Sequence, residues 1–307
     1  MSGRVALARA VTQRPRSRQL GQADQPGQAS RPGARPGDAV TGNSPVQRLG
    51  RRLQALTPDH PQRYAVTDLS AESDRDPEWL PIAGVVPAML SHAGEHLSLS
   101  PAVAGARMAG TLGYAVAGRL AVALAVTGQA FDVGPDSLMV RLDGDGLIER
   151  IGVRSPVLAV SAADPSIGPG PHPITRFADF GAVIAWSAAR AWTTLGPLID
   201  ELHETLRYGR VPMWNLVGDA VLGPATIAPR LAGRDQRTGR ATGSALLDAL
   251  VEQGAPIRRR GTLRESPTPE LPTSWVVTPE ALTPVRGSCC LHFRQTQEMC
   301  ASCPLTG

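Results

Sequence analysis

Four cysteines near the C-terminus are the residues of this chain best suited to chemistry. They are Cys289, Cys290, Cys300 and Cys303, and the 307 residues contain no other cysteine. A chain of this length builds a core without disulfides, and a disulfide that closes a short loop adds little stability. The clustering therefore favours a metal centre with thiolate ligands over two disulfides or free thiols.

Zinc and iron–sulfur clusters are the two metal centres that four thiolates suit. Zinc sites usually take their ligands in C-x2–4-C pairs, and Cys300 with Cys303 forms one such pair. Cys289 and Cys290 are adjacent, and adjacent side chains tend to point apart, which makes one small ion hard to hold. A [2Fe–2S] cluster is larger and takes four thiolates, although ordinary ferredoxins use other spacings. The pattern favours a cluster, with structural zinc as the alternative.

The arrangement C-C-x9-C-x2-C resembles the C-terminal motif of the FhuF-like ferric-siderophore reductases. Arg286 precedes the first pair by three residues, and Phe293 and Arg294 follow it. That family carries a [2Fe–2S] cluster on C-C-x10-C-x2-C near the end of the chain, so the spacer here is one residue shorter. The resemblance covers this motif firmly and residues 65–305 loosely.

The resemblance implies a cofactor, an activity and partners. The four cysteines would be the ligands of the [2Fe–2S] cluster, and the chain would pass one electron to the Fe(III) of a ferric siderophore, with the hydroxamate type as a candidate class. An external electron donor, such as a ferredoxin or a reductase, would be required. A non-catalytic accessory protein that carries zinc or a cluster and serves in siderophore handling is the alternative.

Charged and polar residues beside the cysteines are candidates for tuning the reduction potential. Arg286, His292 and Arg294 would stabilise the more negative reduced state, and Ser288 and Ser302 would donate hydrogen bonds to sulfur. The alternative is that these are ordinary loop residues. Few residues follow Cys303 in the sequence, so we expect the cluster near the surface, where electrons enter and leave.

Two other stretches have both a functional and a structural interpretation. Arg258, Arg259 and Arg260 would dock an acidic electron donor or an anionic ligand, or they would protect the edge of a strand. Trp214-Asn215 resembles a Trp-Gly-Asn segment of FhuF-like proteins, although the glycine is absent here. On physical grounds we expect Asn215 to cap a helix and the Trp214 side chain to pack between subdomains.

Composition and charge exclude several functions. All 31 basic residues are arginine. The first 63 residues hold 11 arginines and three acidic residues, which gives +8, whereas residues 64–307 carry a net charge of −4. The basic character thus belongs to the leading segment, and no recognisable nucleic-acid-binding motif accompanies it. The sequence also lacks a G-x-G-x-x-G loop, a Walker loop and a G-x-S-x-G motif.

No secretory signal is evident in the sequence, because the apolar stretch near Val5 is short and Arg9 interrupts it. We therefore expect a cytoplasmic protein, whose reducing environment keeps thiols available for cluster assembly. Residues 100–126 predict a long apolar helix that begins at Ser100-Pro101. Arg107 and Arg119 favour a buried core helix over a transmembrane span.

The pattern as a whole predicts an α+β fold, with a mostly helical body, a small antiparallel sheet and a cysteine-rich C-terminal segment. Residues 1–45 are rich in Arg, Pro and Gly and predict a disordered tail. Residues 46–280 would form the body and residues 281–307 the cluster-binding segment. Residues 138–153 predict a hairpin that turns at Asp143-Gly-Asp-Gly146, and Val157–Val160 would add a third strand.

Overall fold

The computed structural model describes residues 44–59, 63–69, 78–96, 99–164, 173–265, 282–291, 294, 299 and 302–304. All of these belong to one compact unit, Gly42–Gly307. The predicted tail of residues 1–45 lies outside the described residues, apart from Ser44 and Pro45.

Seven α-helices and nine strands make up the described part of the chain. The helices are α1 (Pro45–Gln54), α2 (Val85–His96), α3 (Pro101–Gly113), α4 (Arg119–Thr127), α5 (Phe180–Leu206), α6 (Arg210–Leu231) and α7 (Gln236–Glu252). A 3₁₀ turn, η1 (Ile82–Gly84), precedes α2, and a π-helical turn, η2 (Tyr114–Gly118), joins α3 to α4. The strands are β1 (Thr67–Asp68), β2 (Leu80–Pro81), β3 (Ala130–Phe131), β4 (Leu138–Leu142), β5 (Ile148–Val153), β6 (Leu158–Ser161), β7 (Ile174–Phe177), β8 (Thr262–Glu265) and β9 (Leu282–Val285).

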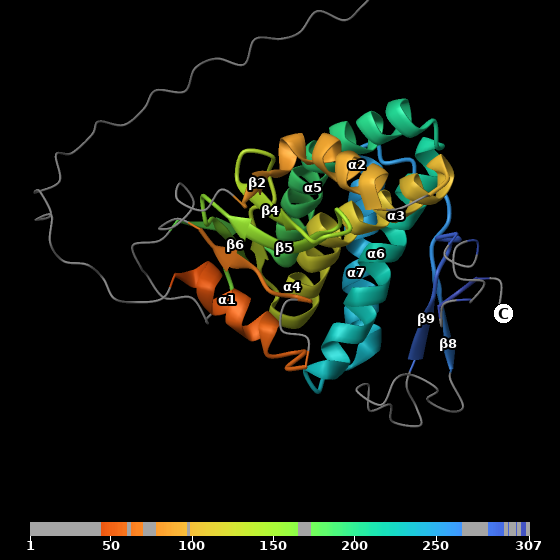
Figure 1. Ribbon diagram of the computed structural model, residues 1–307. Helices are drawn as coiled ribbons and strands as arrows, with labels where there is room; N and C mark the ends of the chain where they lie inside the picture. Colours follow the sequence, from red (N-terminus) through yellow and green to blue (C-terminus); the bar gives the residue numbers. More distant parts are fainter. Residues whose placement is uncertain are drawn as a thin grey trace, which may run out of the picture. The chain divides into compact units, whose positions relative to one another are not determined.

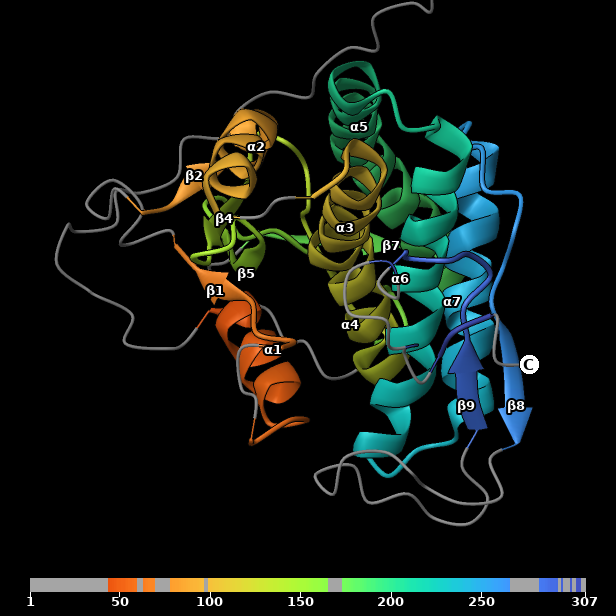
Figure 2. The same ribbon diagram turned by 45° about the vertical axis from the view of Figure 1, so that its right-hand side comes forward.

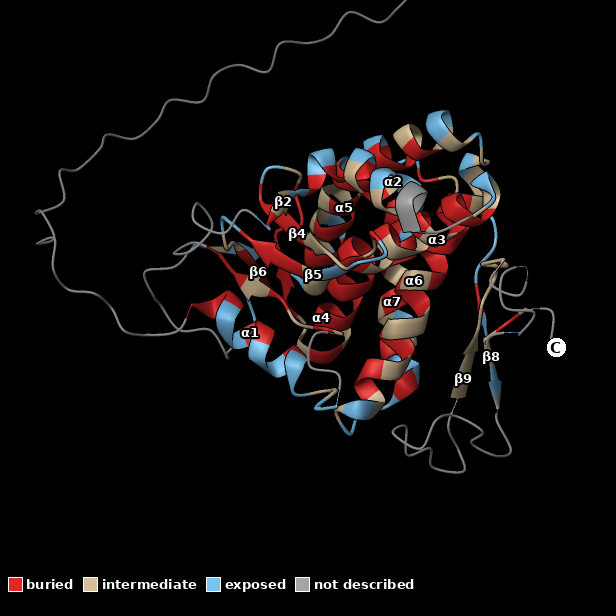
Figure 3. Cartoon of the chain, in the orientation of Figure 1, coloured by how far each residue is buried: buried red, intermediate tan, exposed pale blue. Residues whose placement is uncertain are grey.

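The helices form the centre of the unit. Figure 1 and Figure 2 show α3 to α7 packed together, with the sheet that contains β4 and β5 on one side and the β8–β9 hairpin on the other. Figure 3 shows that the buried positions lie on the helix faces that turn toward one another. The predicted α+β class, with its mostly helical body, is confirmed.

The continuous helical segment from Pro101 to Thr127 lies in the core. The Ser100 side chain accepts a hydrogen bond from the Val103 amide at 3.4 Å, and Gly128, at φ 72°, ends the segment. The prediction of a helix from Ser100-Pro101 to about Val126 is therefore confirmed. By length and composition it could cross a membrane, but most of it is buried within the protein.

Small residues let this segment approach α6 closely. A Cβ atom on Gly113 would lie 2.9 Å from the Val217 Cα, and one on Gly118 would lie 2.6 Å from the Ala220 carbonyl oxygen. Arg119, only 2% exposed, donates from a terminal nitrogen to the Glu149 carbonyl at 3.0 Å. Its charge is therefore held against backbone carbonyl groups inside the protein.

Three small sheets accompany the helices. β4 and β5 form the predicted antiparallel hairpin, β2 extends it antiparallel to β4, and β1 pairs parallel with β5. β6 does not join this hairpin as the third strand that the sequence suggested, because it pairs antiparallel with β3 and parallel with β7. The sheets are therefore partly parallel. β9, from the predicted C-terminal segment, pairs antiparallel with β8.

Helix α6 begins earlier than the sequence suggested. Its first residue is Arg210 and Gly209 is its N-cap, so Asn215 lies within the helix and does not cap it. Asn215 is 5% exposed and Trp214 is fully buried. Trp214 packs against Trp192 of α5, with ring centroids 5.1 Å apart. Both side chains are thus part of the interior beneath the β8–β9 hairpin.

Candidate metal centre

The first cysteine pair follows a short turn that Asp219 of α6 holds in place. One oxygen of the Asp219 carboxylate accepts from the Gly287 amide at 2.7 Å. The other accepts from the Ser288 amide at 3.1 Å and from the Ser288 hydroxyl at 2.6 Å. Asp219 and Ser288 are each 9% exposed. The residue immediately before Cys289 is therefore fixed by two hydrogen bonds to a helix of the core.

Asn215 holds the segment that leads into β8 in place in the same way, by hydrogen bonds from its side chain. Its amide oxygen accepts from the backbone amides of Arg258 at 2.8 Å and Arg259 at 3.0 Å. Asn215 and Asp219 are four residues apart, so they lie on one face of α6. α6 thus holds the backbone of Arg258 and Arg259, and the Arg260 side chain forms an ion pair with Asp248 at 2.7 Å. The docking role and the strand-edge role of these three arginines both stay predictions.

Glycine at position 287 allows the turn before Cys289 to contact the backbone of residues 259–261. A Cβ atom there would lie 2.7 Å from the Arg260 carbonyl carbon and 2.9 Å from the Gly261 amide nitrogen. Real Cβ atoms do not approach backbone so closely. The base of the hairpin therefore places the start of the cysteine segment directly against the backbone of residues 259–261.

A backbone contact brings the two ends of the cysteine segment together. The Arg286 amide donates to the Ser302 carbonyl at 2.9 Å, which places Cys303 beside the turn that carries Cys289 and Cys290. Cys303 is 4% exposed, whereas Cys289 and Cys290 are half-buried. No disulfide joins any of these three described cysteines. Cys300 and His292 lie outside the described residues.

The backbone after the first pair turns back toward sulfur. The Leu291 amide donates to the Cys289 sulfur at 3.4 Å, and Leu291 itself has a positive φ of 58°. This left-handed conformation is uncommon for a side chain such as leucine. It recurs at sites where the surrounding structure imposes a functional geometry. An amide directed at sulfur is also one of the contacts that set the potential of an iron–sulfur centre.

Tyr208, at the junction of α5 and α6, lies within electrostatic range of both adjacent cysteines. Burial raises the pKa of its phenol most, and the charges of Cys289 and Cys290 raise it further. Its backbone carbonyl accepts from the His203 ring at 2.7 Å. The Tyr208 phenol of the helical body is therefore electrostatically coupled to the vicinal cysteines.

One of the two serines expected to donate to sulfur has another partner, because the Ser288 hydroxyl donates to Asp219. The hydrogen bond expected from the Ser302 hydroxyl to sulfur stays a prediction. Burial raises the pKa of Asp219 above its ordinary value, and the hydrogen bonds from Ser288 and Gly287 and the charge of Arg286 oppose this rise. Asp219 was not identified from the sequence. The signal was present, because it is the one acidic residue of α6 and stands four positions after the singled-out Asn215.

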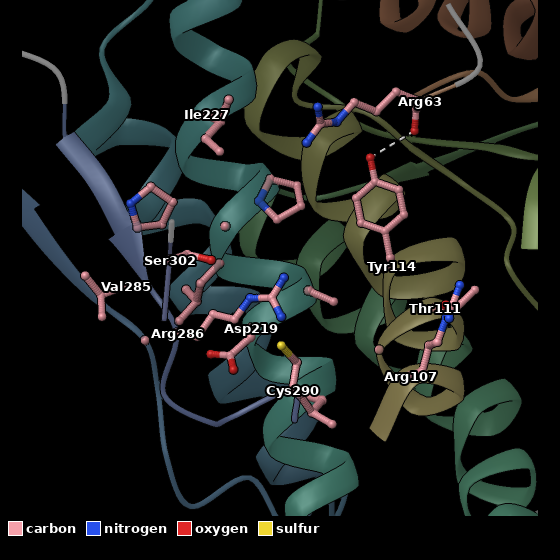
Figure 4. A pocket seen from close by; sticks show the side chains of 18 of the residues that line it. Arg63, Arg107, Thr111, Tyr114, Asp219, Ile227, Val285, Arg286, Cys290 and Ser302 are labelled. Carbon is pink, nitrogen blue, oxygen red and sulfur yellow. Dashed lines mark hydrogen bonds between the residues drawn. The ribbon is translucent and has the colours of Figure 1, made fainter. Parts of the chain in front are cut away.

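The cysteine segment borders a large cavity between α3, α6 and β9. Its volume is about 900 Å³, and Cys290 and Ser302 lie in its wall. Figure 4 shows Cys290 and Arg286 on one side of this cavity, with Arg63 and Arg107 across from them. The volume falls in the range of small-molecule sites, which is roughly 300–1,000 Å³.

The donor set fits a thiolate-bound metal centre by its chemistry. Soft thiolate ligands select zinc, copper(I) and iron–sulfur clusters, and the described cysteines have no disulfide partner. Among the described residues no three His, Cys, Asp or Glu side chains gather around one point. Cys289, Cys290 and Cys303 therefore do not converge on one point in the part of the chain that the structure describes, and their joint ligation of a metal centre stays a prediction.

Comparison with known families decides which metal centre this is. Residues 286–305 match the family model described as the FhuF 2Fe-2S C-terminal domain. The C-terminal segment is similar to this domain over residues 286–305. Its cofactor is a [2Fe–2S] cluster, so the resemblance drawn from the cysteine spacing is confirmed. No match was found among curated proteins.

The FhuF 2Fe-2S C-terminal domain begins at Arg286, directly after β9. Its first residues are therefore those that Asp219 and the Arg286–Ser302 contact hold in place. The chain is an iron–sulfur protein in which a core helix anchors the cluster domain beside a cavity.

Proposed function

We propose that the protein is a ferric-siderophore reductase that converts chelated Fe(III) to Fe(II). The observation that carries the proposal is the position of Cys290. This residue of the FhuF 2Fe-2S C-terminal domain lines a cavity of about 900 Å³. A chelate in that cavity would lie next to the redox centre, and electron transfer requires such proximity.

Each residue of the site has a defined task in this proposal. Cys289, Cys290, Cys300 and Cys303 would hold the cluster. When bound, a [2Fe–2S] cluster stores and passes one electron. Asp219 fixes the turn before the first two ligands through the amides of Gly287 and Ser288.

The proposed reaction is a one-electron transfer in which the protein forms no covalent bond with the chelate. Fe(III) in the chelate gains one electron, and an external donor, such as a ferredoxin or a reductase, loses one. Fe(II) has a lower charge than Fe(III) and binds hard oxygen ligands less strongly, so the chelate releases its iron. The reducing cytoplasm is the compartment that suits this reaction.

Metal and sulfide analysis tests whether the four cysteines hold a [2Fe–2S] cluster. Full-length protein, purified or reconstituted without oxygen, should contain iron and acid-labile sulfide in equal amounts and little zinc. Changing any one of the four cysteines to serine should remove most of both. A colourless protein with one zinc per chain would overturn the cluster ligation.

The activity has its own test. Dithionite-reduced protein, freed of excess reductant, is mixed with ferric chelates of neutral and of anionic types, and its visible spectrum is followed while a ferrous indicator traps released Fe(II). We expect rapid reoxidation together with Fe(II) release for at least one type. If no chelate reoxidises the reduced protein, the alternative holds, and the chain is a non-catalytic accessory protein.

A further inference from the structure

The cavity beside Cys290 has an unusual charge for a small-molecule site. Five arginines from five parts of the chain contribute to its described lining, namely Arg63, Arg107, Arg230, Arg240 and Arg286. The acidic residues among the same described lining residues are Asp143 and Asp219. The arginine and aspartate side chains of the described lining therefore sum to +3, five positive charges against two negative ones, before the negative charge of a thiolate-bound cluster at Cys290 is counted.

Both acidic residues already use their carboxylates to hold backbone. Asp219 accepts three hydrogen bonds from Gly287 and Ser288. Asp143 accepts from the amides of Asp145 and Leu147, each at 2.9 Å, to shape the β4–β5 turn. Donors of their own thus satisfy the hydrogen-bonding capacity of these carboxylates, while the charge of Asp219 also acts on Arg286 and Arg240.

The ion pair of Arg107 is with a residue outside the lining. Arg107 meets Asp145 at 3.2 Å, and the Asp145 side chain is 52% exposed. Exposed pairs of this kind contribute little and are screened by salt. Arg107 can therefore turn its charge toward an anion in the cavity at small cost.

The arginines lie on both sides of the space. Arg63 stands beside Tyr114 and Arg107 beside Thr111 on one wall, and Arg286 stands beside Cys290 on the other. Side chains such as Ile227 and Val285 contribute apolar surface to the lining. Such surface lowers the local dielectric constant, which strengthens the attraction of the arginines for an anion. The guanidinium group also matches carboxylate geometry with two parallel hydrogen bonds.

Ferric chelates differ in the charge that they would bring to this cavity. Three hydroxamate groups lose one proton each and cancel the charge of Fe(III), so the chelate core is neutral. Catecholate groups and hydroxycarboxylate groups lose two protons each, so their ferric complexes are anions. A positively charged cavity separates these two kinds of chelate by electrostatic complementarity.

We infer that the cavity takes a ferric chelate of net negative charge, of the hydroxycarboxylate or catecholate kind, with Arg63, Arg107 and Arg286 as its charge contacts. This differs from the hydroxamate class suggested by the family resemblance. It deepens the proposed function and rests on it, since the chelate bound there is the oxidant that Cys290 faces.

Redox-inert gallium(III) chelates test the binding without any electron transfer. Cluster-loaded, full-length protein is titrated by calorimetry with the Ga(III) complexes of citrate, of a tris-catecholate and of a neutral tris-hydroxamate. We expect at least one of the two anionic complexes to bind tenfold or more tightly than the neutral one. Whether the citrate or the tris-catecholate complex binds shows which of the two kinds of anionic chelate the cavity takes. Its affinity should fall as salt rises from low to physiological concentration.

Matched variants place the binding in this cavity. Arg107→Gln should weaken the anionic complex about fivefold or more and leave the neutral one unchanged. Asp145→Asn, which frees Arg107 of its ion pair, should leave anion binding equal or tighter, which shows that the loss does not arise from a disturbed turn. Arg154→Gln removes an exposed charge outside the cavity lining, and it should have no effect.

Three results would overturn the inference. They are equal or tighter binding of the neutral complex, absence of binding by both anionic complexes, and an Arg107→Gln variant that is folded and binds the anion normally. These outcomes are distinct from failure of the proposed function. Reduction of neutral chelates alone would refute the charge preference but support the proposed reductase activity. Binding of anionic chelates without any Fe(III) reduction would support the charge preference but refute the reductase activity.

Discussion

Asn215 and Asp219 lie one turn apart on α6 and hold the two chain segments that flank the β8–β9 hairpin. Asn215 accepts from the amides of residues 258 and 259, and Asp219 accepts from those of residues 287 and 288. A single helix face therefore sets the position of the FhuF 2Fe-2S C-terminal domain relative to the core. Four predictions follow from this face and from the buried groups around it.

Replacing Asp219 by asparagine should loosen the cluster. An amide has one acceptor oxygen where the carboxylate has two, so at least one of the donors on Gly287 and Ser288 would lose its partner. Each buried donor left unsatisfied costs about 1–3 kcal/mol. We expect the iron and sulfide content after anaerobic reconstitution to fall well below that of the unaltered protein, and cluster loss in air to become faster.

Glu252→Gln is the control for this experiment, because Glu252 is an exposed acid at the end of α7. It removes the same charge without touching the turn. Unchanged cluster content and air stability in Asp219→Asn would show that the turn does not position the ligands.

Replacing Asn215 by alanine should destabilise the fold more than it alters the cluster. The change leaves the amides of Arg258 and Arg259 without their acceptor in a half-buried place, at a cost of about 1–3 kcal/mol each when water does not replace it. Thermal unfolding followed by circular dichroism should show a lower melting temperature. A melting temperature equal to that of the unaltered protein would contradict the assigned contact.

Replacing Gly287 by alanine should push the hairpin base apart. The added Cβ atom would meet backbone atoms of residues 259–261 at 2.7–3.0 Å, and backbone cannot rotate away as a flexible side chain does. We expect a lower melting temperature together with reduced cluster content. Gly84→Ala is the matched control, since a Cβ atom there meets nothing within 4 Å. Equal behaviour of the two variants would refute the close approach.

The three tyrosines should resist ionisation in alkali. Burial is the largest cause that raises the pKa of each of Tyr64, Tyr114 and Tyr208 above the ordinary value of 10.0. A raised pKa in the folded state stabilises the protein below pH 10, and this stabilisation is lost as the pH rises through the folded-state value. Tyrosinate absorbance should therefore remain small just above pH 10 and increase together with unfolding.

Tyr64→Phe provides the comparison for this titration, because it should remove one tyrosinate from the steep alkaline step. A folded protein in which all three phenols ionise near pH 10 would refute the burial of these side chains.

The elements with local signals could be predicted from the sequence. Ser100-Pro101 marked a helix start, and Asp143-Gly-Asp-Gly146 marked the turn of a hairpin, since caps and tight turns depend on neighbouring residues. Pairing between distant strands has no such signal. For this reason β6 was expected beside the hairpin, whereas it lies between β3 and β7.

The sequence by itself predicted the cofactor, because ligand type and spacing are properties of neighbouring residues, and C-C-x9-C-x2-C favours a [2Fe–2S] cluster over structural zinc. Only the tertiary structure decided what surrounds it. Asp219, Arg63 and Arg107 are far from the cysteines in the sequence, and no local pattern connects them. The folding of α3, α6 and β9 against one another brings them to one cavity beside Cys290, since burial of apolar helix faces acts over any separation along the chain.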